Sequence, residues 1–486
     1  MRIRLDEFGF RYLGRDADAL SRVDLDVAPG ETVVLTGRSG CGKSTVIRAV
    51  NGLVPDFHAG TVEGRVLLDD RDVADLPSHE RAALVGTVFQ DPRSQFFTTT
   101  VDDEIAFACE NLGLPSARIA ERVERSAALV GVEALLGREV FALSSGQKQL
   151  VALASVLAAD PAVLVLDEPA ANLDALATAA LTAALARLRA GGTTILVAEH
   201  RLAYLLPLAD RVLRMDGGRI ADAWTPRELL DLPEPVRVDL GLRDPAPAPG
   251  GSSVRRTRGT SAERPAESPA VASAGPSGDQ PVRVEVRGLV VRVGGSSVLD
   301  GLDLDVRAAP GRVVGITGPI GSGKTTLARA LCGLVRTRGE IRVDGRARSR
   351  RQRVAGGFFV MQDTDYQLFS DSAAHELELS RPGIDRAEVD RVLGTLGLGG
   401  LGDAHPLGLS GGQKQRLAIA AAAVNPARLV VLDEPTSGLD ADGMRRVARI
   451  LRDLAADGRL VLVTSHDEEL LRECDAVRLA LVPAAA

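Results

Sequence analysis

The feature that most constrains the fold of this 486-residue chain is an internal duplication of one ordered set of motifs. Each copy begins with the pattern G-x-x-x-x-G-K-[ST], at residues 37–44 and again at residues 318–325. A Gln, an L-S-[SG]-G-Q peptide, an apolar run ending in Asp-Glu, and a His then follow in the same order. Such self-similarity indicates a repeated structural unit, so we expect two domains of one fold.

The spacing of the motifs shows where the copies differ. An offset of 266 residues separates Gln147 from Gln413, and the same offset holds from there to the His of each copy. The offset is 281 residues between Lys43 and Lys324, at the first motif. The second copy is therefore shorter between its first motif and its L-S-G-G-Q peptide.

Local patterns place these motifs on strands, loops and helices. In each copy an apolar strand, 32–36 or 313–317, leads into the glycine-rich loop, and a helix is expected directly after it. A second apolar strand, 163–166 or 429–432, ends at the Asp-Glu pair. Buried strands that alternate with helices predict a mainly parallel α/β sheet, with ligands at the carboxyl ends of the strands.

Composition excludes several classes of protein. The formal charge of −7 and the isoelectric point near 5.6 argue against a nucleic-acid partner. The four cysteines form no C-x-x-C pair, which argues against a disulfide framework or a zinc site. Cys41 lies inside the first loop, where a small residue that fits a tight turn is favoured over a reactive thiol. No apolar run reaches the ~18 residues of a membrane span, and the N-terminus has no apolar signal region.

The chain divides into three parts by composition. Residues 1–240 form the first predicted domain and residues 282–486 the second. Residues 241–281 are rich in Pro, Ala, Gly and Ser, a composition that predicts a flexible linker. The arginines of this linker could touch anionic lipid or RNA, but interspersed acidic residues favour a solvated tether.

The ordered motifs resemble two nucleotide-binding domains of the ATP-binding cassette (ABC) superfamily fused in one chain. The resemblance implies two tandem P-loop domains, each with a mainly parallel sheet core, an antiparallel β subdomain and a helical subdomain. It also implies ATP hydrolysis with ATP and Mg²⁺ as cofactors.

The glycine-rich loops are expected to hold the phosphates, because backbone N–H groups and a helix N-terminus face them. Lys43 and Lys324 should reach the β- and γ-phosphates, and Ser44 and Thr325 should ligate Mg²⁺. The other predicted loop residues are Gly37, Arg38, Ser39, Gly40, Cys41, Gly42 and Thr45 in the first copy, and Gly318, Pro319, Ile320, Gly321, Ser322, Gly323 and Thr326 in the second.

Further roles come from the resemblance. Asp167 and Asp433 would assist in holding Mg²⁺, and Glu168 and Glu434 would polarise the attacking water. The resemblance implies that His200 and His466 contact the γ-phosphate. It also implies that Gln90 and Gln362 sense the Mg²⁺–water site. Asp174 and Asp440 match a loop that crosses between the two sites of such proteins.

In this superfamily two domains dock head to tail, so each ATP meets the signature peptide of the other domain. Site one would then combine Lys43 and Glu168 with the second signature, and site two would combine Lys324 and Glu434 with the first. The two predicted signature peptides are Ser144, Ser145, Gly146 and Gln147, and Ser410, Gly411, Gly412 and Gln413.

The departures from the family pattern fall on site two. Ser145 stands where the family has a glycine that approaches the γ-phosphate. Tyr12 fits the aromatic residue that stacks on adenine, but the aligned residue of the second copy is Val293. We therefore expect site one to dominate turnover.

The segments around Gln90 and Gln362 narrow the resemblance to one group within the superfamily. Residues 88–104 and 361–370, and the peptide Glu199-His200-Arg201-Leu202, are similar to energy-coupling-factor importer ATPases of the cobalt and vitamin type. This resemblance implies a transmembrane T component, a substrate-binding S component and a peripheral position on the cytoplasmic face of the membrane. Candidates to line the groove for a coupling helix of the T component are Phe96, Phe97, Leu368 and Phe369.

Two alternatives remain open. A tandem-cassette translation factor on ribosomes would have no membrane partner, but such proteins join their domains by a charged helical segment. A fused ATPase of a sugar importer is the nearer alternative. Vitamin, vitamin precursor and transition-metal ion all remain possible cargoes, because specificity in this system lies in the S component.

Overall fold

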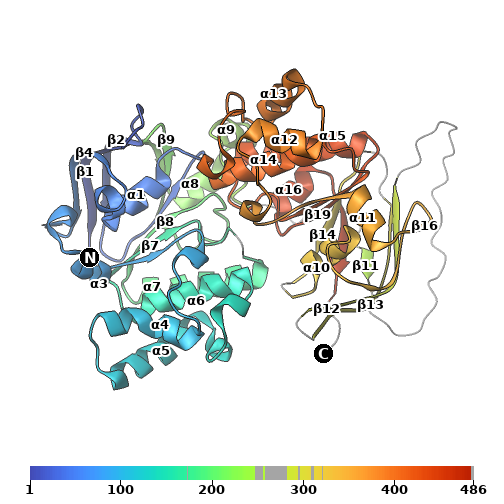
Figure 1. The fold of residues 1–486 in the computed structure, drawn as a ribbon. Coiled ribbons are helices and arrows are strands. Elements are labelled where there is room, and N and C mark those ends of the chain that lie inside the picture. Colours follow the sequence, from blue (N-terminus) through green and yellow to red (C-terminus); the bar gives the residue numbers. More distant parts are fainter. Residues whose placement is uncertain are drawn as a thin grey trace. The chain divides into compact units, whose positions relative to one another are not determined.

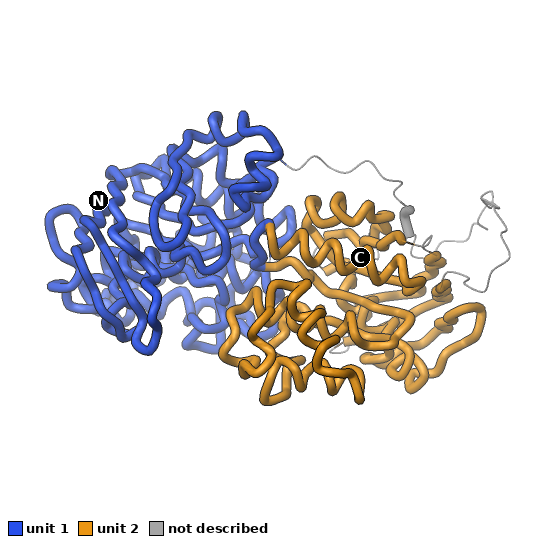
Figure 2. Tube along the Cα trace, turned by 90° about the horizontal axis from the view of Figure 1, so that it is seen from above, with its two compact units in different colours: residues 1–247, 438–441 blue, residues 248–437, 442–486 orange. Residues whose placement is uncertain are grey.

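The computed structural model describes residues 1–171, 173–246, 255–257, 282–293, 296–307, 311–319 and 321–482. The chain forms two compact units, shown in different colours in Figure 2. Unit 1 contains Met1–Pro247 with Gly438–Ala441, and unit 2 contains Ala248–Ser437 with Asp442–Ala486. Most of the predicted linker 241–281 lies outside the described residues, but Leu242 is buried in a core cluster of unit 1.

Unit 1 contains a six-stranded sheet that positions the first set of motifs. Five of its strands are parallel, and the last, β10, runs antiparallel to β9. The order is β10-β9-β3-β8-β7-β6. The strands are β3 (Thr32–Thr36), β6 (Val85–Val88), β7 (Val163–Asp167), β8 (Thr194–Ala198), β9 (Arg211–Asp216) and β10 (Arg219–Trp224). Every residue of β3, β7 and β8 is buried, which explains why their sequences are mainly apolar and do not alternate with polar residues.

A second, antiparallel sheet covers one side of this core. Its order is β2-β1-β4-β5, with β1 at Ile3–Tyr12, β2 at Leu20–Val27, β4 at Gly60–Leu68 and β5 at Arg71–Asp72. The two sheets and helix α1 (Lys43–Val50) share one apolar cluster, which includes Phe10, Leu35 and Ile47. The phosphate-binding loop is therefore attached to a rigid core on both sides.

The helices of unit 1 gather mainly on the other side of the parallel sheet (Figure 1). A helical group packs α4 (Val101–Asn111) and α5 (Ser116–Val130) against α6 (Ser145–Ala158). The remaining helices are α2 (Leu53–Asp56), α3 (Ser78–Leu84), α7 (Ala175–Ala190), α8 (Pro226–Asp231) and α9 (Glu234–Asp239).

Unit 2 repeats the two sheets. Its larger sheet has the order β11-β20-β14-β19-β18-β17, and all of its described pairings are parallel. These strands are β11 (Arg255–Thr257), β14 (Val314–Thr317), β17 (Gly357–Val360), β18 (Leu429–Asp433), β19 (Leu460–Thr464) and β20 (Val477–Leu481). The antiparallel sheet contains β12 (Arg283–Val293), β13 (Ser296–Arg307), β15 (Arg338–Val343) and β16 (Arg346–Ala347).

The helices of unit 2 follow a similar plan. They are α10 (Lys324–Leu331), α11 (Arg350–Gly356), α12 (Ala373–Ser380), α13 (Arg386–Thr395), α14 (Gly411–Val424), α15 (Ala441–Ala456) and α16 (Glu468–Glu473). Within the described residues, however, none of them corresponds to α2, α8 or α9, and α16 has no helical counterpart in unit 1. The segment between α10 and β15 is described and has no counterpart of α2, which accounts for part of the shorter spacing in the second copy.

The architecture confirms the expected fold class, since each unit has a parallel sheet core, an antiparallel sheet and a helical group. The expected strands and helices agree with the structure to within one or two residues. Within the described residues, no helix is long and apolar enough to cross a membrane.

Candidate functional site

One glycine sets the path of each phosphate-binding loop where it leaves its strand. Gly37 has a φ of +133°, and a Cβ atom there would lie 2.3 Å from the carbonyl oxygen of Met215. Gly318 has a φ of +146°, and its Cβ would lie 2.4 Å from the carbonyl oxygen of Leu481. Because any side chain would collide with backbone, only glycine allows the loop to leave its strand this closely.

The loop lysine of each unit lies inside the loop. Lys43 Nζ donates hydrogen bonds to the carbonyl oxygens of Gly37 (2.9 Å) and Arg38 (3.1 Å). In unit 2, Lys324 Nζ donates to the carbonyl oxygens of Gly318 (2.7 Å) and Pro319 (3.1 Å). These cationic groups and the N-termini of α1 and α10 form a cradle that suits phosphate.

The other predicted loop residues lie between the strand and the helix. Arg38 Nη2 donates to the carbonyl oxygen of Asp239, and Cys41 and Ser322 are both buried. The Ser322 hydroxyl has no hydrogen-bond partner among the described residues. Ile320 lies outside the described residues. The remaining predicted members of this part are Ser39, Gly40, Gly42, Pro319, Gly321 and Gly323.

A hydroxyl and a carboxylate meet beside each loop. Ser44 Oγ donates to Asp167 Oδ1 at 2.9 Å, and Thr325 Oγ1 donates to Asp433 Oδ1 at 3.1 Å. Burial, and then the adjacent charge of Glu168, raises the pKa of Asp167 to about 6. These oxygen ligands fit Mg²⁺, whose charge would favour the ionised carboxylate.

The glutamate after each of these aspartates occupies a strained backbone position. Glu168 and Glu434 both have a φ of +46°, in the left-handed region. The backbone N–H of Glu168 donates to the carbonyl oxygen of Ala198 at 2.8 Å, and that of Glu434 donates to Thr464 at 2.9 Å. Each acid is thus attached to the end of the neighbouring strand, β8 or β19.

In unit 1 the glutamate meets two other predicted residues. Gln90 Nε2 donates to Glu168 Oε2 at 2.8 Å, and His200 Nε2 lies 3.4 Å from Glu168 Oε1. The structure therefore brings together Gln90, Glu168 and His200, which come from three segments of the chain. His200 and Glu168 are both buried, so water reaches them poorly in this arrangement.

The corresponding group in unit 2 also places the histidine beside the glutamate. His466 Nε2 lies 3.7 Å from Glu434 Oε1. Ser465 Oγ and the backbone N–H of His466 donate to Glu434 Oε2, each at 3.3 Å. Gln362 directly follows Met361 after strand β17, as Gln90 follows Phe89 after β6.

The sequence reasoning did not assign a role to Glu199. Its carboxylate accepts hydrogen bonds from the backbone of His200 (2.7 Å) and Arg201 (3.1 Å) and from the Tyr204 hydroxyl (2.9 Å). Burial, and then the charge of Glu168, raises the pKa of Glu199. The Glu-His-Arg-Leu peptide contained the signal, but only the fold shows that this acid holds the backbone of His200.

Tyr12 lies next to the first loop. Its hydroxyl is 3.1 Å from Thr45 Oγ1 and accepts a 3.0 Å hydrogen bond from Arg48 Nη1. In unit 2, Val293 ends strand β12 with 55% of its surface exposed, and Thr326 takes the place of Thr45. The aromatic side chain is therefore anchored to the phosphate-loop helix in unit 1 alone.

The signature peptides begin two matching helices. Ser144 caps α6 and Ser410 caps α14, and each cap is completed by a Gln side chain, Gln147 or Gln413. A Cβ atom at Gly411 would meet no atom within 4 Å in unit 2. Ser145 is exposed. Gly146 lies in the first turn of α6, and Gly412 lies in the first turn of α14. The packing of unit 2 therefore does not itself require glycine at position 411.

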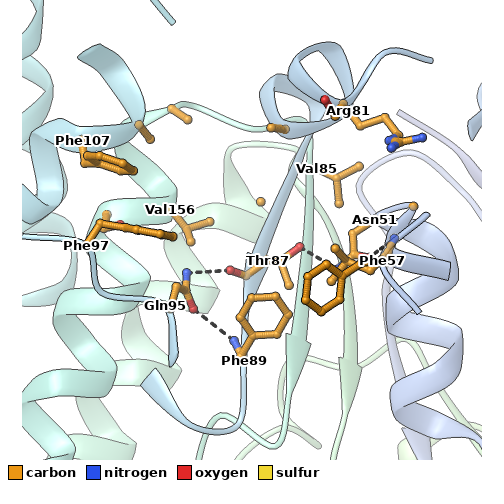
Figure 3. A pocket seen from close by; sticks show the side chains of 18 of the residues that line it. Asn51, Phe57, Arg81, Val85, Thr87, Phe89, Gln95, Phe97, Phe107 and Val156 are labelled. Carbon is orange, nitrogen blue, oxygen red and sulfur yellow. Dashed lines mark hydrogen bonds between the residues drawn. The ribbon is translucent and has the colours of Figure 1, made fainter. Parts of the chain in front are cut away.

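Unit 1 also has an apolar groove of about 500 Å³ between its parallel sheet and α4 (Figure 3). Phe97 and Phe107 form one wall, with their rings stacked 4.9 Å apart, and Phe57 lies on the opposite side. Gln95 supports the floor, because it accepts a hydrogen bond from the Phe89 N–H (3.3 Å) and donates to the Thr87 carbonyl (2.9 Å).

The four candidates for lining such a groove differ in their exposure. Phe96 does not line the groove of unit 1, since it packs against the apolar core instead. In unit 2, Leu368 is buried, whereas Phe369 is 79% exposed. In each pair, therefore, the second residue is the accessible one, because the chain turns between them.

Comparison with known proteins agrees with this geometry. Residues 20–171 and 299–437 match the family described as ABC transporter. A Treponema denticola relative whose name describes an ABC transporter ATP-binding protein is 39% identical over 97% of this chain and 93% of its own length. A Streptomyces coelicolor relative with the same kind of name is 37% identical over 97% of this chain and 90% of its own length.

Solved structures match about half of the chain. The structure of cbiO1 from Clostridium perfringens, part of the ABC transporter complex cbiONQ, is 30% identical, with a TM-score of 0.43. It covers 49% of this chain and 93% of that protein. ABC ATP-binding proteins pair with transmembrane components. The chain belongs to the ABC transporter family, and it is an ABC ATPase with two cassettes fused in tandem.

Proposed function

We propose that the chain is the ATP-hydrolysing subunit of an energy-coupling-factor importer, which takes up a vitamin, a vitamin precursor or a transition-metal ion. Its partners would be a T component and one or more S components, and it would lie on the cytoplasmic face of the cell membrane. The observation that carries the proposal is the groove of unit 1, which is connected to the candidate catalytic glutamate.

That connection runs through one short segment. Phe89 lines the groove, and the next residue, Gln90, hydrogen-bonds Glu168. Gln95 binds the backbone of Phe89 and also lines the groove. A helix that enters the groove would therefore press on the segment that positions Glu168, so nucleotide state and membrane partner would be coupled.

The residues divide the chemistry of hydrolysis among them. Lys43 and the loop N–H groups would bind the phosphates, and Glu168 would orient and polarise the attacking water, with His200 beside it. Mg²⁺, when bound through Ser44 and Asp167, would neutralise phosphate charge. In unit 2 the corresponding residues are Lys324, Thr325, Asp433, Glu434 and His466.

We further propose that each unit supplies its signature peptide to the loop of the other unit, either within one chain or between two chains. Site one would then pair Lys43 and Glu168 with Gly411, and site two would pair Lys324 and Glu434 with Ser145. The anchored Tyr12, and the serine at position 145 of the first signature peptide, support site one as the dominant site.

The test is purification of the Glu168→Gln, Glu434→Gln chain with ATP from detergent-solubilised cells, followed by mass spectrometry. We expect a T-like membrane protein together with a small multispan companion, which would indicate the cargo. The control adds Phe97→Asp on the exposed groove wall and should lose both proteins while it still binds ATP. Recovery of ribosomal proteins, or of a sugar permease, would contradict the proposal.

A further inference from the structure

The segment of unit 2 before Gln362 is strongly basic. Residues 336–356 contain eight arginines and two acidic residues, a formal charge of +6. The corresponding segment of unit 1, residues 55–84, contains three arginines and seven acidic residues, a formal charge of −4. The whole chain has a formal charge of −7, so this segment of unit 2 is opposite in charge to the chain as a whole.

Most of these arginines have no acidic partner. Glu340 pairs with Arg342 (3.1 Å), and the Asp344 carboxylate accepts hydrogen bonds from the Arg283 backbone and from Arg428, each at 3.0 Å. Six arginines of the segment remain besides Arg342 and the buried Arg353. Among the described residues, no carboxylate forms an ion pair with any of these six. We call these six the basic surface: Arg336, Arg338, Arg346, Arg348, Arg350 and Arg351.

The eighth arginine holds this surface together. Arg353 is buried, and its guanidinium donates to the carbonyl oxygen of Arg348 (3.0 Å) and to Thr337 Oγ1 (3.2 Å). Arg353 thereby connects α11 both to the residue before β15 and to the turn before α11. Burial, and then the charge of Arg350, lowers the pKa of Arg353. In unit 1 the equivalent Arg81 is instead paired with Asp56.

Apolar side chains lie within the basic surface. Leu334 and Val354 are exposed, at 45% and 51% of their surface. They belong to one patch, because Arg350 Nε donates to the Gly333 carbonyl oxygen at 2.9 Å, and a Cβ on Gly333 would lie 3.1 Å from Val354. Exposed apolar groups among arginines are typical of surfaces that enter the headgroup region of a membrane.

The basic surface also has a defined place in the unit. Gln90 follows Arg81 by nine positions, and Gln362 follows Arg353 by the same nine, so α11 corresponds to α3. Ser78, Arg81 and Ala82 of α3 line the groove of unit 1. The basic surface therefore borders the part of unit 2 that corresponds to this groove, and α2 with its Asp56 is missing there.

We propose that the basic surface of unit 2 binds the phosphate groups of anionic phospholipids. Arginine forks bind phosphate oxygens in pairs, and clusters of four to eight basic residues suffice to recognise an anionic bilayer. This contact needs no protein partner, so it is separate from the importer function.

The experiment measures binding of the full chain to protein-free vesicles by flotation. Vesicles of phosphatidylcholine with about 30% phosphatidylglycerol are compared with pure phosphatidylcholine. The test variant is Arg336→Gln, Arg346→Gln, Arg351→Gln. The control variant is Arg15→Gln, Arg22→Gln, Arg227→Gln, which removes the same charge from exposed positions of unit 1.

We expect the test variant to lose at least about tenfold in affinity for the anionic vesicles, while the control variant binds as the unaltered chain does. Binding should also weaken as salt rises from about 0.1 M to 1 M. Basal ATP hydrolysis should be unchanged in both. Equal binding by the two variants, binding to pure phosphatidylcholine, or a loss seen only with RNA or an acidic peptide would overturn the proposal.

Discussion

The side-chain amide of Gln90 donates a 2.8 Å hydrogen bond to Glu168, so the groove segment and the candidate catalytic acid of unit 1 are directly joined. Neither residue is near the other in sequence. Their contact depends on the parallel pairing of β6 with β7, which brings the ends of these strands together. Gln90 is thus placed to transmit movement of the groove wall to the site of hydrolysis.

Replacement of Gln90 by Ala should lower kcat by about 10- to 100-fold, because Glu168 would lose the donor that orients it. ATP affinity should change little, since Gln90 lies beside the hydrolytic acid rather than in the phosphate loop. Steady-state ATPase kinetics measure both effects. Gln362→Ala is the matched control in unit 2 and should reduce kcat less.

The two glutamates should contribute unequally to turnover. We expect kcat to fall at least about 100-fold in Glu168→Gln, but less than about fivefold in Glu434→Gln. The reason is that both departures from the family pattern, Ser145 and Val293, fall on site two, which would use Glu434. Phosphate-release kinetics test this ranking, and loss of activity only in Glu434→Gln would reverse it.

The signature serines should have separable structural and functional effects. Ser410→Ala removes the N-cap of α14 and should lower the free energy of unfolding by about 1 kcal/mol. Ser410→Asp keeps a capping side chain and should preserve stability, but its charge would repel a phosphate and lower ATPase activity. Urea unfolding and ATPase assays on both variants distinguish the roles. Equal activity in Ser410→Asp and the unaltered chain would contradict a phosphate contact.

The four cysteines should be unreactive in the folded chain. All four are buried, and burial raises the pKa of Cys41 and Cys109 and brings the pKa values of Cys332 and Cys474 to about 12. Few thiolates are therefore present at neutral pH. Titration with a thiol reagent should show slow reaction at four sites, which becomes rapid in urea. Fast reaction of Cys41 alone would favour the reactive-thiol interpretation of this loop residue.

Ionisation of Asp167 should make unit 1 less stable as pH rises in the absence of nucleotide and Mg²⁺. Its pKa rises from 3.8 to about 6 on folding, so the folded form holds the proton more tightly. This contribution to stability is present below pH 3.8, is lost as pH rises through 6, and amounts to about 3 kcal/mol.

Asp167→Asn should therefore remove much of the loss of stability between pH 4 and pH 7, because a neutral side chain replaces the buried charge. Differential scanning calorimetry of the metal-free protein measures the change in Tm at each pH. The exposed Asp70→Asn serves as the control for a change in net charge. An unchanged pH dependence in Asp167→Asn would show that Asp167 is ionised throughout.

Several features could not be predicted from the sequence and are seen only in the folded chain. Glu199 looked like part of a peptide motif, and only the fold buries it and directs it toward the His200 backbone and Tyr204. Phe96 and Phe97 are equally apolar in sequence, yet one packs in the core and the other lines the groove. The direction of each side chain depends on how the segment turns after β6, which apolarity does not encode.

The sequence by itself determined the duplicated fold, the ABC family and the two phosphate loops, because periodic apolar strands, invariant loop spacing and glycine geometry are local properties of a chain. The tertiary structure alone decided that Gln90 meets Glu168 and that a groove adjoins them. Those contacts join residues far apart in sequence, so they depend on strand order and packing, which place distant side chains at the same sheet edge.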